Sequence, residues 1–369
     1  MDFSWTAEQR EVHARMRALG AEADAAPPDE RLSCLARGGA LGLSLPLEHG
    51  GGGLDQVTTA YAYEALGATL RDGGTLLAAG AHLFGVASMV ARVGTPSQRA
   101  ALLPRWATGE AIATVAATEV ESGSDVASVG TLAEHHGNGF RVTGKKRFVT
   151  WADDADHYFV VARNGKDGRG LTALVIPRTT PGLTVGPRLA TAGLRGARLA
   201  PIELAGCVVG AEALFGRPGA GLAVFQIAMT FERALVLAYR LGALQRALDE
   251  AVKFARTREI GGAAIARYQA VSHRIARMKM RLEASRLLVY RAAWLLDQAE
   301  RGQAEAALAK WHLAEAALAS ALDDVHIRGG SGFLEDSGMP AAVDDALGGS
   351  MHSGTQDVLA TIVARWLGL

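Results

Sequence analysis

The spacing of hydrophobic and polar residues divides the chain into three stretches. Residues 1–112 and 212–369 repeat apolar residues every three or four positions, as helices do. Residues 113–211 instead hold short apolar runs separated by Gly, Pro and Asn. The pattern predicts an α+β protein with an N-terminal helical domain, a middle β domain and a C-terminal helical domain, divided at those residues.

The first stretch predicts three helices. Thr6 is a residue type that caps helices and Pro27-Pro28 stops one, so a helix is expected over 7–25. Two more helices are expected over 56–70 and 78–93, after a run of four glycines.

Short strands are expected in the middle stretch. One strand, with a turn near Thr143-Gly144, is predicted over 140–150. The remaining predicted strands are 157–162, 171–176, 183–185 and 202–204. Short strands separated by turn residues are typical of a small antiparallel barrel or sandwich.

The last stretch predicts long helices. They are expected over 224–255, 265–296, 304–325 and 355–367. Helices this long and apolar must bury a face against one another, so a four-helix bundle is expected.

Composition narrows the classes of function. The chain has 38 basic and 38 acidic residues, which gives no support for a nucleic-acid or membrane-surface partner. No apolar run is long enough to span a bilayer, and residues 1–20 lack the apolar core of a signal peptide. Two distant cysteines, Cys34 and Cys207, suit a reducing cytoplasm. His135-His136 has no third ligand nearby, so no metal site is expected.

Six motifs stand in one order along nearly the whole chain: 41–53, Thr118–Asp125, Gly144–Thr150, Arg256–Gly262 with Gln269, Gly329–Phe333 and Ser353–Thr355. Together they resemble the acyl-CoA dehydrogenase superfamily. Thr118–Asp125 is similar to its flavin loop, T-E-P-x-A-G-S-D, and Gly144–Thr150 to G-x-K-x-[W/F]-I-T. The other four are 41–53, similar to the first-domain signature; Arg256–Gly262 with Gln269, similar to R-x-x-F-G; Gly329–Phe333, similar to G-G-x-G-[FY]; and Ser353–Thr355, at the place of E-G-T. Residues 269–283 and 352–357 further resemble the carrier-protein branch, which includes prolyl-carrier-protein dehydrogenases.

The resemblance implies FAD and a base that removes the α-proton of a thioester. Most of the family carries a glutamate immediately before Gly-Thr, but Ser353 stands there. A subset keeps its base before an arginine in the first bundle helix, which corresponds to Glu232 before Arg233. Glu232 is therefore the expected base, with Arg233 orienting it, and the Ser353 N–H is expected to donate to the thioester carbonyl. Taken without the family, Glu232 is more simply a salt-bridged helix residue.

Further roles follow from the resemblance alone. The residues expected to bind FAD are Thr118, Gly123, Ser124, Phe148, Thr150, Arg258, Gln269, His326, Gly329, Gly330, Thr355 and Asp357. Ser124, Thr230 and Gly354 are expected to touch the substrate. Taken alone, Phe148 would be a core residue on a strand, and Arg258 a solvated arginine. Because Arg258 is expected to reach FAD across a subunit interface, a homodimer or homotetramer is predicted.

The predicted activity is oxidation of an acyl or aminoacyl thioester, with prolyl on a peptidyl carrier protein as the first candidate. Gly261, His326 and Asp344 replace the family's usual phenylalanine, glutamine and arginine. Three alternatives stay open: dehydrogenation of free CoA esters, a non-redox flavoprotein cyclase, and a flavin-poor partner subunit of a heteromeric complex.

Overall fold

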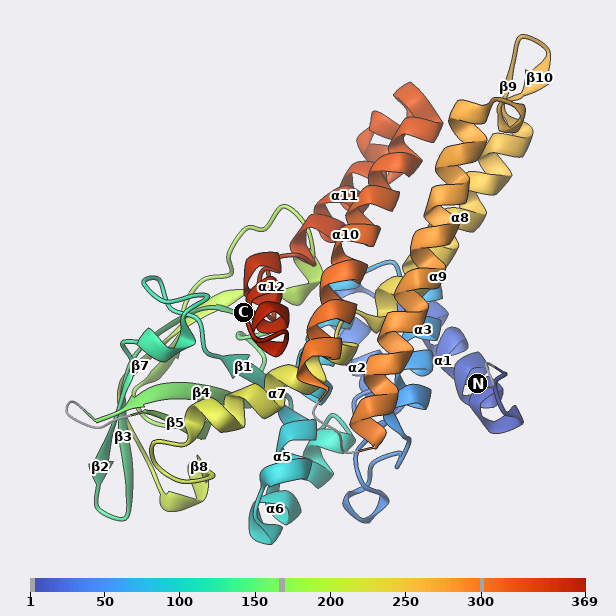
Figure 1. The fold of residues 1–369 in the computed structure, drawn as a ribbon. Helices are drawn as coiled ribbons and strands as arrows, with labels where there is room; N and C mark the ends of the chain where they lie inside the picture. The colour runs from blue at the N-terminus through green and yellow to red at the C-terminus, as the bar shows by residue number, and fades with distance from the viewer. Residues whose placement is uncertain (1–3, 166–169, 299–301) are drawn as a thin grey trace.

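The computed structural model describes residues 4–165, 170–298 and 302–369, and it has the predicted order of helices, strands and helices (Figure 1). The first helices are α1 (Ala7–Ala25), α2 (Arg31–Arg37), α3 (Gln56–Thr69), α4 (Gly73–Gly80), α5 (Ser88–Val93) and α6 (Pro96–Ala107). Thr6 caps α1 as predicted, because its side chain accepts a hydrogen bond from Gln9 N, and the Gln9 side chain accepts one from Thr6 N. The helix expected from residue 78 begins earlier, at Gly73, because Asp72 Oδ1 accepts from Gly74 N at 3.0 Å. A π-helical turn, Ala81–Ala87, joins α4 to α5.

The described residues of the middle stretch form one eight-stranded sheet that does not close into a barrel. Its strands are β1 (Ala113–Ala116), β2 (Leu132–His136), β3 (Gly139–Val149), β4 (His157–Asn164), β5 (Leu171–Pro177), β6 (Leu183–Val185), β7 (Ala200–Val209) and β8 (Leu214–Phe215). The order is β6-β7-β3-β2-β4-β5-β8, with β1 beside β4, and the β1–β4 and β2–β4 pairs are parallel. The sheet is therefore mixed rather than antiparallel throughout.

The turn predicted at Thr143-Gly144 is wrong. β3 continues through both residues, and the irregularity lies on the neighbouring strand. Val142 pairs with Cys207 and Thr143 with Ala205, so Gly206, at φ 70°, is the extra residue of a bulge in β7.

The C-terminal helices are α7 (Gly221–Leu235), α8 (Ala238–Thr257), α9 (Gln269–Asp297), α10 (Gln303–Arg328), α11 (Met339–Gly348) and α12 (Gln356–Trp366). The single helix predicted over 224–255 is wrong, since the chain bends at Val236-Leu237 and begins α8. A hairpin of β9 (Glu259–Ile260) and β10 (Ala263–Ala264) joins α8 to α9.

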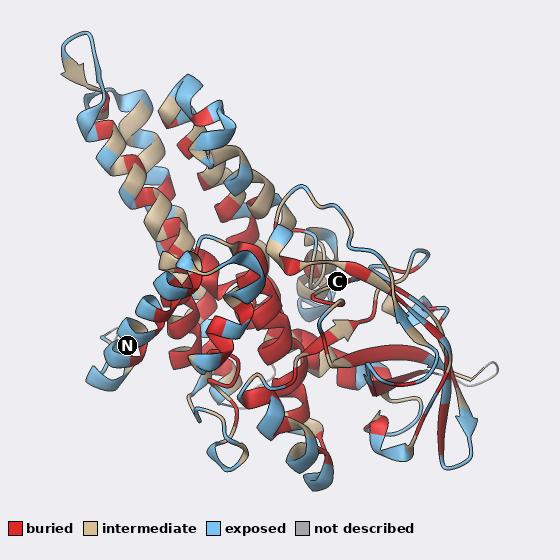
Figure 2. Cartoon of the chain, turned by 180° about the vertical axis from the view of Figure 1, so that it is seen from behind, coloured by how far each residue is buried: buried red, intermediate tan, exposed pale blue. Residues whose placement is uncertain are grey.

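One hydrophobic core runs through both helical domains. It includes residues of α1, α3, α8, α9 and α10, while the inner face of the sheet has a smaller core of its own. Buried residues are continuous where the helices meet (Figure 2). The backbones approach closely there, because a methyl group at Gly67 of α3 would lie 1.8 Å from Tyr239 O of α8.

In the described part of the chain, two helical segments are long and apolar enough to cross a membrane by composition, contrary to the expectation from the sequence. They are Gly73–Val93 and Gly221–Thr257, and 83% and 67% of their most apolar windows are buried inside the fold. Burial in the core accounts for their composition.

Candidate active site

Glu232 lies on the buried face of α7. The helix buries Val224, Phe225, Ala228 and Met229 at the spacing of one helical face, and Glu232 continues that row. Packing alone would place an apolar residue there, because burying a carboxylate is costly. The position therefore indicates a chemical role for Glu232.

The two oxygens of the Glu232 carboxylate have different surroundings. Oε1 accepts a hydrogen bond from Ser353 Oγ. Oε2 is buried and, among the described residues, has no hydrogen-bond partner. It faces Gly85 of the π-helical turn, where an added methyl group would lie 2.7 Å from it. One oxygen is held, and the other keeps the unshared lone pair that a base needs.

Burial sets the protonation of this cluster. It raises the pKa of Glu232, against the hydrogen bond from Ser353 and the positive charges of Arg233 and Lys310, which lower it. Burial also lowers the pKa of Lys310 to about 7. The pKa of His352 falls well below its usual value, first through burial and then through Lys310 and Arg240. His352 is therefore neutral near pH 7, beside a carboxyl whose proton affinity is raised.

The segment 352–354 enters the site in a strained backbone conformation. Ser353 has φ 54° and Gly354 φ 99°, in the left-handed region that L side chains rarely adopt. Arg233 Nε donates to Ser353 O at 3.0 Å, and Lys310 Nζ donates to Gly354 O at 2.7 Å. Arg233 thus orients this segment, and the serine at the family's usual base position contacts the carboxylate at 232.

A buried ion pair fixes the loop that resembles a flavin loop. The Lys146 side chain is 0% exposed, and its Nζ donates to Glu119 Oε1 at 2.7 Å and to Ala117 O at 3.0 Å. Glu119 also accepts from Thr131 N at 2.9 Å, and Arg147 N donates to Thr118 O at 2.8 Å. The motifs at 118–125 and 144–150 are therefore joined into one rigid unit.

The surface above this unit is open. Gly123 and Ser124 are exposed, and a methyl group on Gly123 would meet no atom within 4 Å. Phe148 is 52% exposed with φ 57°, so its interpretation as a core residue is wrong. Thr150 follows β3 directly, and its carbonyl accepts from Thr114 Oγ1 at 2.7 Å. Phe148 thus presents an exposed aromatic face, and Gly123 and Ser124 present exposed backbone.

Other expected cofactor residues lie far from that surface within one chain. Arg258 caps the C-terminus of α8 and Gln269 begins α9, at the tip of the helical domain beside the β9–β10 hairpin (Figure 1). Gly329 and Gly330 follow α10, and a methyl group on either would meet no atom within 4 Å. The chain does not bring these groups to the 118–125 loop.

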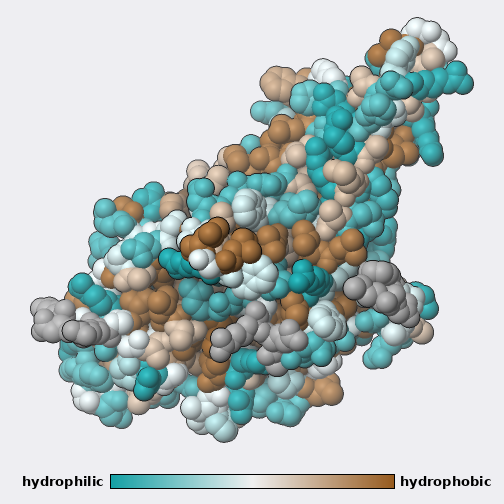
Figure 3. Space-filling view, viewed as in Figure 1, coloured by the Kyte–Doolittle hydropathy of each residue, from teal (hydrophilic) through white to brown (hydrophobic). Residues whose placement is uncertain are grey.

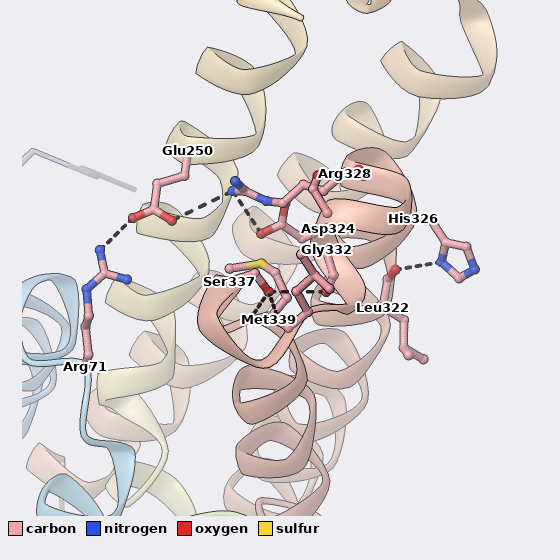
Figure 4. Close-up of polar contacts among 11 residues, drawn as sticks. Arg71, Glu250, Leu322, Asp324, His326, Arg328, Gly332, Ser337 and Met339 are labelled. Atoms are coloured by element: carbon pink, nitrogen blue, oxygen red, sulfur yellow. Dashed lines mark hydrogen bonds and ion pairs between the residues drawn. The ribbon is translucent and has the colours of Figure 1, made fainter.

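Figure 4 shows the end of α10. His326 Nδ1 lies 2.6 Å from Leu322 O of its own helix, and its ring points away from Arg328. Arg328 Nε donates to Asp324 at 2.9 Å, and Glu250 of α8 lies between Arg328 and Arg71. This network fixes α10 against α8 and leaves His326 on the outside.

One departure from the family pattern, at Gly261, has a structural reason, whereas nothing in the structure explains the aspartate at 344. Gly261 and Gly262 have φ 61° and 78°, so they form the tight turn of the β9–β10 hairpin, which a phenylalanine would strain. Asp344 lies where α11 meets the loop at Gly193, whose added methyl group would be 2.3 Å from the Asp344 carbonyl carbon. Asp345 Oδ1 then accepts from Leu194 N at 2.6 Å.

The remaining expected residues are Thr230, Thr355 and Asp357. Thr230 is two residues before Glu232 on α7, and its hydroxyl donates to Gln226 O at 2.7 Å. Thr355 precedes α12, and Asp357 is exposed in the first turn of that helix.

Sequence reasoning assigned no role to His352, Lys310 or Gly85. Lys310 stands in a buried, alanine-rich row of α10, which was a usable signal, because a lysine on such a row requires a polar partner. Gly85 carried no signal, since its closeness to Glu232 depends on the π-helical turn. In the described part of the chain no group of three His, Cys, Asp or Glu residues could hold a metal ion.

The chain belongs to the acyl-CoA dehydrogenase family. The family's N-terminal domain matches residues 6–110, its middle domain 114–207 and its C-terminal domain 219–368. The fold class and the family were thus predicted correctly from the sequence.

Three of the proteins similar to this chain match at least 99% of its length. An L-prolyl-[peptidyl-carrier protein] dehydrogenase of Pseudomonas fluorescens is 37% identical, with both chains fully covered. The crystal structure of the prolyl acyl carrier protein oxidase AnaB is 30% identical with a TM-score of 0.94, and the match covers 99% of this chain and 100% of that one. The structure of PigA with FAD and proline is 30% identical with a TM-score of 0.95 and full coverage of both chains.

Proposed function

We propose that this protein is an FAD-dependent dehydrogenase that oxidises prolyl held as a thioester on a peptidyl carrier protein, with Glu232 as the base. The observation that carries the proposal is the Glu232 carboxylate, which is buried on α7 with one oxygen held and the other free. A carboxylate with a raised pKa suits removal of a proton next to a thioester carbonyl. The similarity to prolyl-carrier-protein enzymes supports the substrate.

The residues present fit FAD. The exposed Phe148 ring, the open backbone at Gly123 and the rigid Glu119–Lys146 unit offer a planar face and small anion-binding turns. When bound, FAD supplies the two-electron acceptor. The protein's part is to hold the thioester so that its α-proton lies against Glu232 Oε2, and to donate from the Ser353 N–H to its carbonyl.

The assembly is proposed to be a homodimer or a higher homo-oligomer. Arg258, Gln269, Gly329 and Gly330 lie too far from the 118–125 loop to act in the same chain, so a second copy would supply them. Figure 3 shows hydrophobic residues gathered around α12, where Met351, Trp366 and Leu367 are each about 61% to 62% exposed. An apolar face of this kind is typical of a protein interface. We also propose that the protein is cytoplasmic.

The test is anaerobic mixing with prolyl-loaded carrier protein while flavin absorbance near 450 nm is recorded. The native protein is expected to lose this absorbance, and Glu232→Gln is expected to slow the loss by about 100- to 10,000-fold, the usual contribution of general base catalysis. An unchanged rate in Glu232→Gln would refute the base assignment.

Matched substrates separate the alternatives. Prolyl-CoA and a short acyl-CoA tested in parallel distinguish a carrier-dependent enzyme from one that uses free CoA esters. Flavin that stays oxidised while the thioester is consumed would indicate the cyclase. A purified chain without flavin absorbance, which takes up no added FAD, would indicate a partner subunit.

A further inference from the structure

A serine–histidine pair lies directly behind the proposed base. Ser353 Oγ contacts Glu232 Oε1 on one side and lies 2.9 Å from His352 Nδ1 on the other. The second ring nitrogen of His352, Nε2, is buried and has no hydrogen-bond partner among the described residues. The His352 ring is therefore oriented through its contact with Ser353.

The number of protons fixes the direction of both hydrogen bonds. An ionised carboxylate can only accept, so the single hydroxyl proton of Ser353 points to Glu232. His352 Nδ1 must then be the donor to Ser353 Oγ, and Nε2 carries the lone pair. The structure thus assigns the neutral Nδ1–H tautomer to His352. His352 Nδ1 donates to Ser353 Oγ, and Ser353 Oγ donates to Glu232 Oε1.

We propose that Ser353, held by His352, is the positioning residue that aims Glu232 Oε2 at the substrate and keeps Glu232 ionised. The inference rests on the proposed function of Glu232. The pair does not relay the abstracted proton, because His352 Nδ1 already carries a hydrogen and has no capacity to accept another from Ser353. Its effect is on the orientation and the proton affinity of the carboxylate.

The strained backbone supports this role. A serine at φ 54° is disfavoured relative to glycine, yet its carbonyl is fixed by Arg233 and the next carbonyl by Lys310. Arg233 and Lys310 thus hold the backbone of Ser353 and Gly354 in a conformation that serine does not prefer. The conformation places Oγ between His352 and Glu232, which is the arrangement that the positioning role requires.

The charged groups around the pair come from three helices. Arg233 of α7 and Lys310 of α10 face Glu232, while Lys310 and Arg240 of α8 face His352. The π-helical turn presents the uncharged Gly85 to the carboxylate. A change at Ser353 leaves all these charges in place, so a shift in the pH profile can be attributed to the lost hydroxyl.

The test compares Ser353→Ala with Ser353→Gly in the FAD-loaded, full-length protein. Both lose the hydroxyl, but only glycine relieves the backbone at φ 54°. A hydrogen bond to a charged group contributes enough that both variants should reduce flavin about ten- to a hundredfold more slowly at neutral pH. The acid limb of the rate should move up by about one to two pH units in both.

Two histidine variants test the other half of the pair. His352→Asn keeps an N–H donor near the position of Nδ1 and is expected to retain the native pH profile. His352→Leu removes the donor and is expected to move the acid limb in the same direction as Ser353→Ala. Equal profiles for His352→Asn and His352→Leu would overturn the role of His352.

The failure of this inference is distinguishable from failure of the base assignment. If Glu232→Gln abolishes flavin reduction while both Ser353 variants keep the native rate and pH limb, the positioning role is refuted and the base stands. If Glu232→Gln is fully active, the base assignment itself fails. If only Ser353→Ala is impaired and Ser353→Gly is not, the effect comes from backbone strain and the inference is overturned.

Discussion

Replacing Gly85 by alanine is expected to disable Glu232 without replacing any polar side chain. The new methyl carbon would lie 2.7 Å from Oε2 and 3.0 Å from Val115 Cγ2, whereas ordinary contact begins at 3.4 Å. The carboxylate oxygen must therefore retreat by about 0.7 Å. The hydrogen bond between Oε1 and Ser353 opposes that movement.

The size of the effect follows from that displacement. A shift approaching 1 Å at a reacting group costs up to about 100-fold in rate, so flavin reduction should slow by about ten- to a hundredfold. Overpacking of this kind also lowers the free energy of unfolding by about 1–3 kcal/mol. The two effects are measured by anaerobic stopped-flow absorbance near 450 nm and by thermal unfolding.

Gly80→Ala is the matched control. Gly80 lies in α4, which continues into the same π-helical turn, and its added methyl group would be 3.2 Å from Val236 Cγ2 rather than near Glu232. It should therefore reduce flavin at nearly the native rate. Native kinetics in Gly85→Ala, even with a lowered unfolding temperature, would refute the reasoning.

Three further predictions concern the ion pairs and the thiols. Lys146→Met is expected to destabilise the fold by about 3–5 kcal/mol and to release FAD, because it leaves Glu119 buried without its cation. The control is Lys145→Met: the Lys145 side chain is 72% exposed, so its loss should cost under about 1 kcal/mol in thermal unfolding. Lys310→Met should move the acid limb of flavin reduction to higher pH, because the positive charge of Lys310 lowers the pKa of Glu232 and its removal lets that pKa rise; a limb that stays or falls contradicts the assignment. Cys34 and Cys207 are buried with raised thiol pKa values, so a thiol reagent at neutral pH should label neither in the native protein and both after denaturation, and rapid native labelling would contradict their placement.

The sequence predicted the elements whose signals are local. The Thr6 cap, the strand 183–185 and the helical spacing of apolar residues along α10 depend on neighbours in the chain, and the structure confirms them. The break between α7 and α8 and the bulge at Gly206 were missed, because the packing of distant segments decides them. The expected barrel or sandwich was wrong in being antiparallel throughout, since short strands alone do not reveal that β1 and β2 pair in parallel with β4.

The sequence likewise indicated some residues of the candidate site and missed others. The family motif indicated Glu232, and its burial on α7 is consistent with that prediction. His352 acts on the carboxylate through Ser353, Lys310 acts through its charge, and Gly85 lies against it. They belong to three separate segments, so no spacing along the chain joins them to Glu232. The roles of the individual cofactor residues remain predictions from resemblance.

The contact between Gly67 and Tyr239 has a consequence for how the chain can be divided. α3 packs so tightly on α8 that the first hundred residues share their interior with the last hundred and fifty. A fragment ending near residue 110 would expose that apolar face and should aggregate, although a family domain ends there. Calorimetry of the whole chain should accordingly show the two helical regions melting in a single transition, which makes them one cooperative unit during synthesis and turnover.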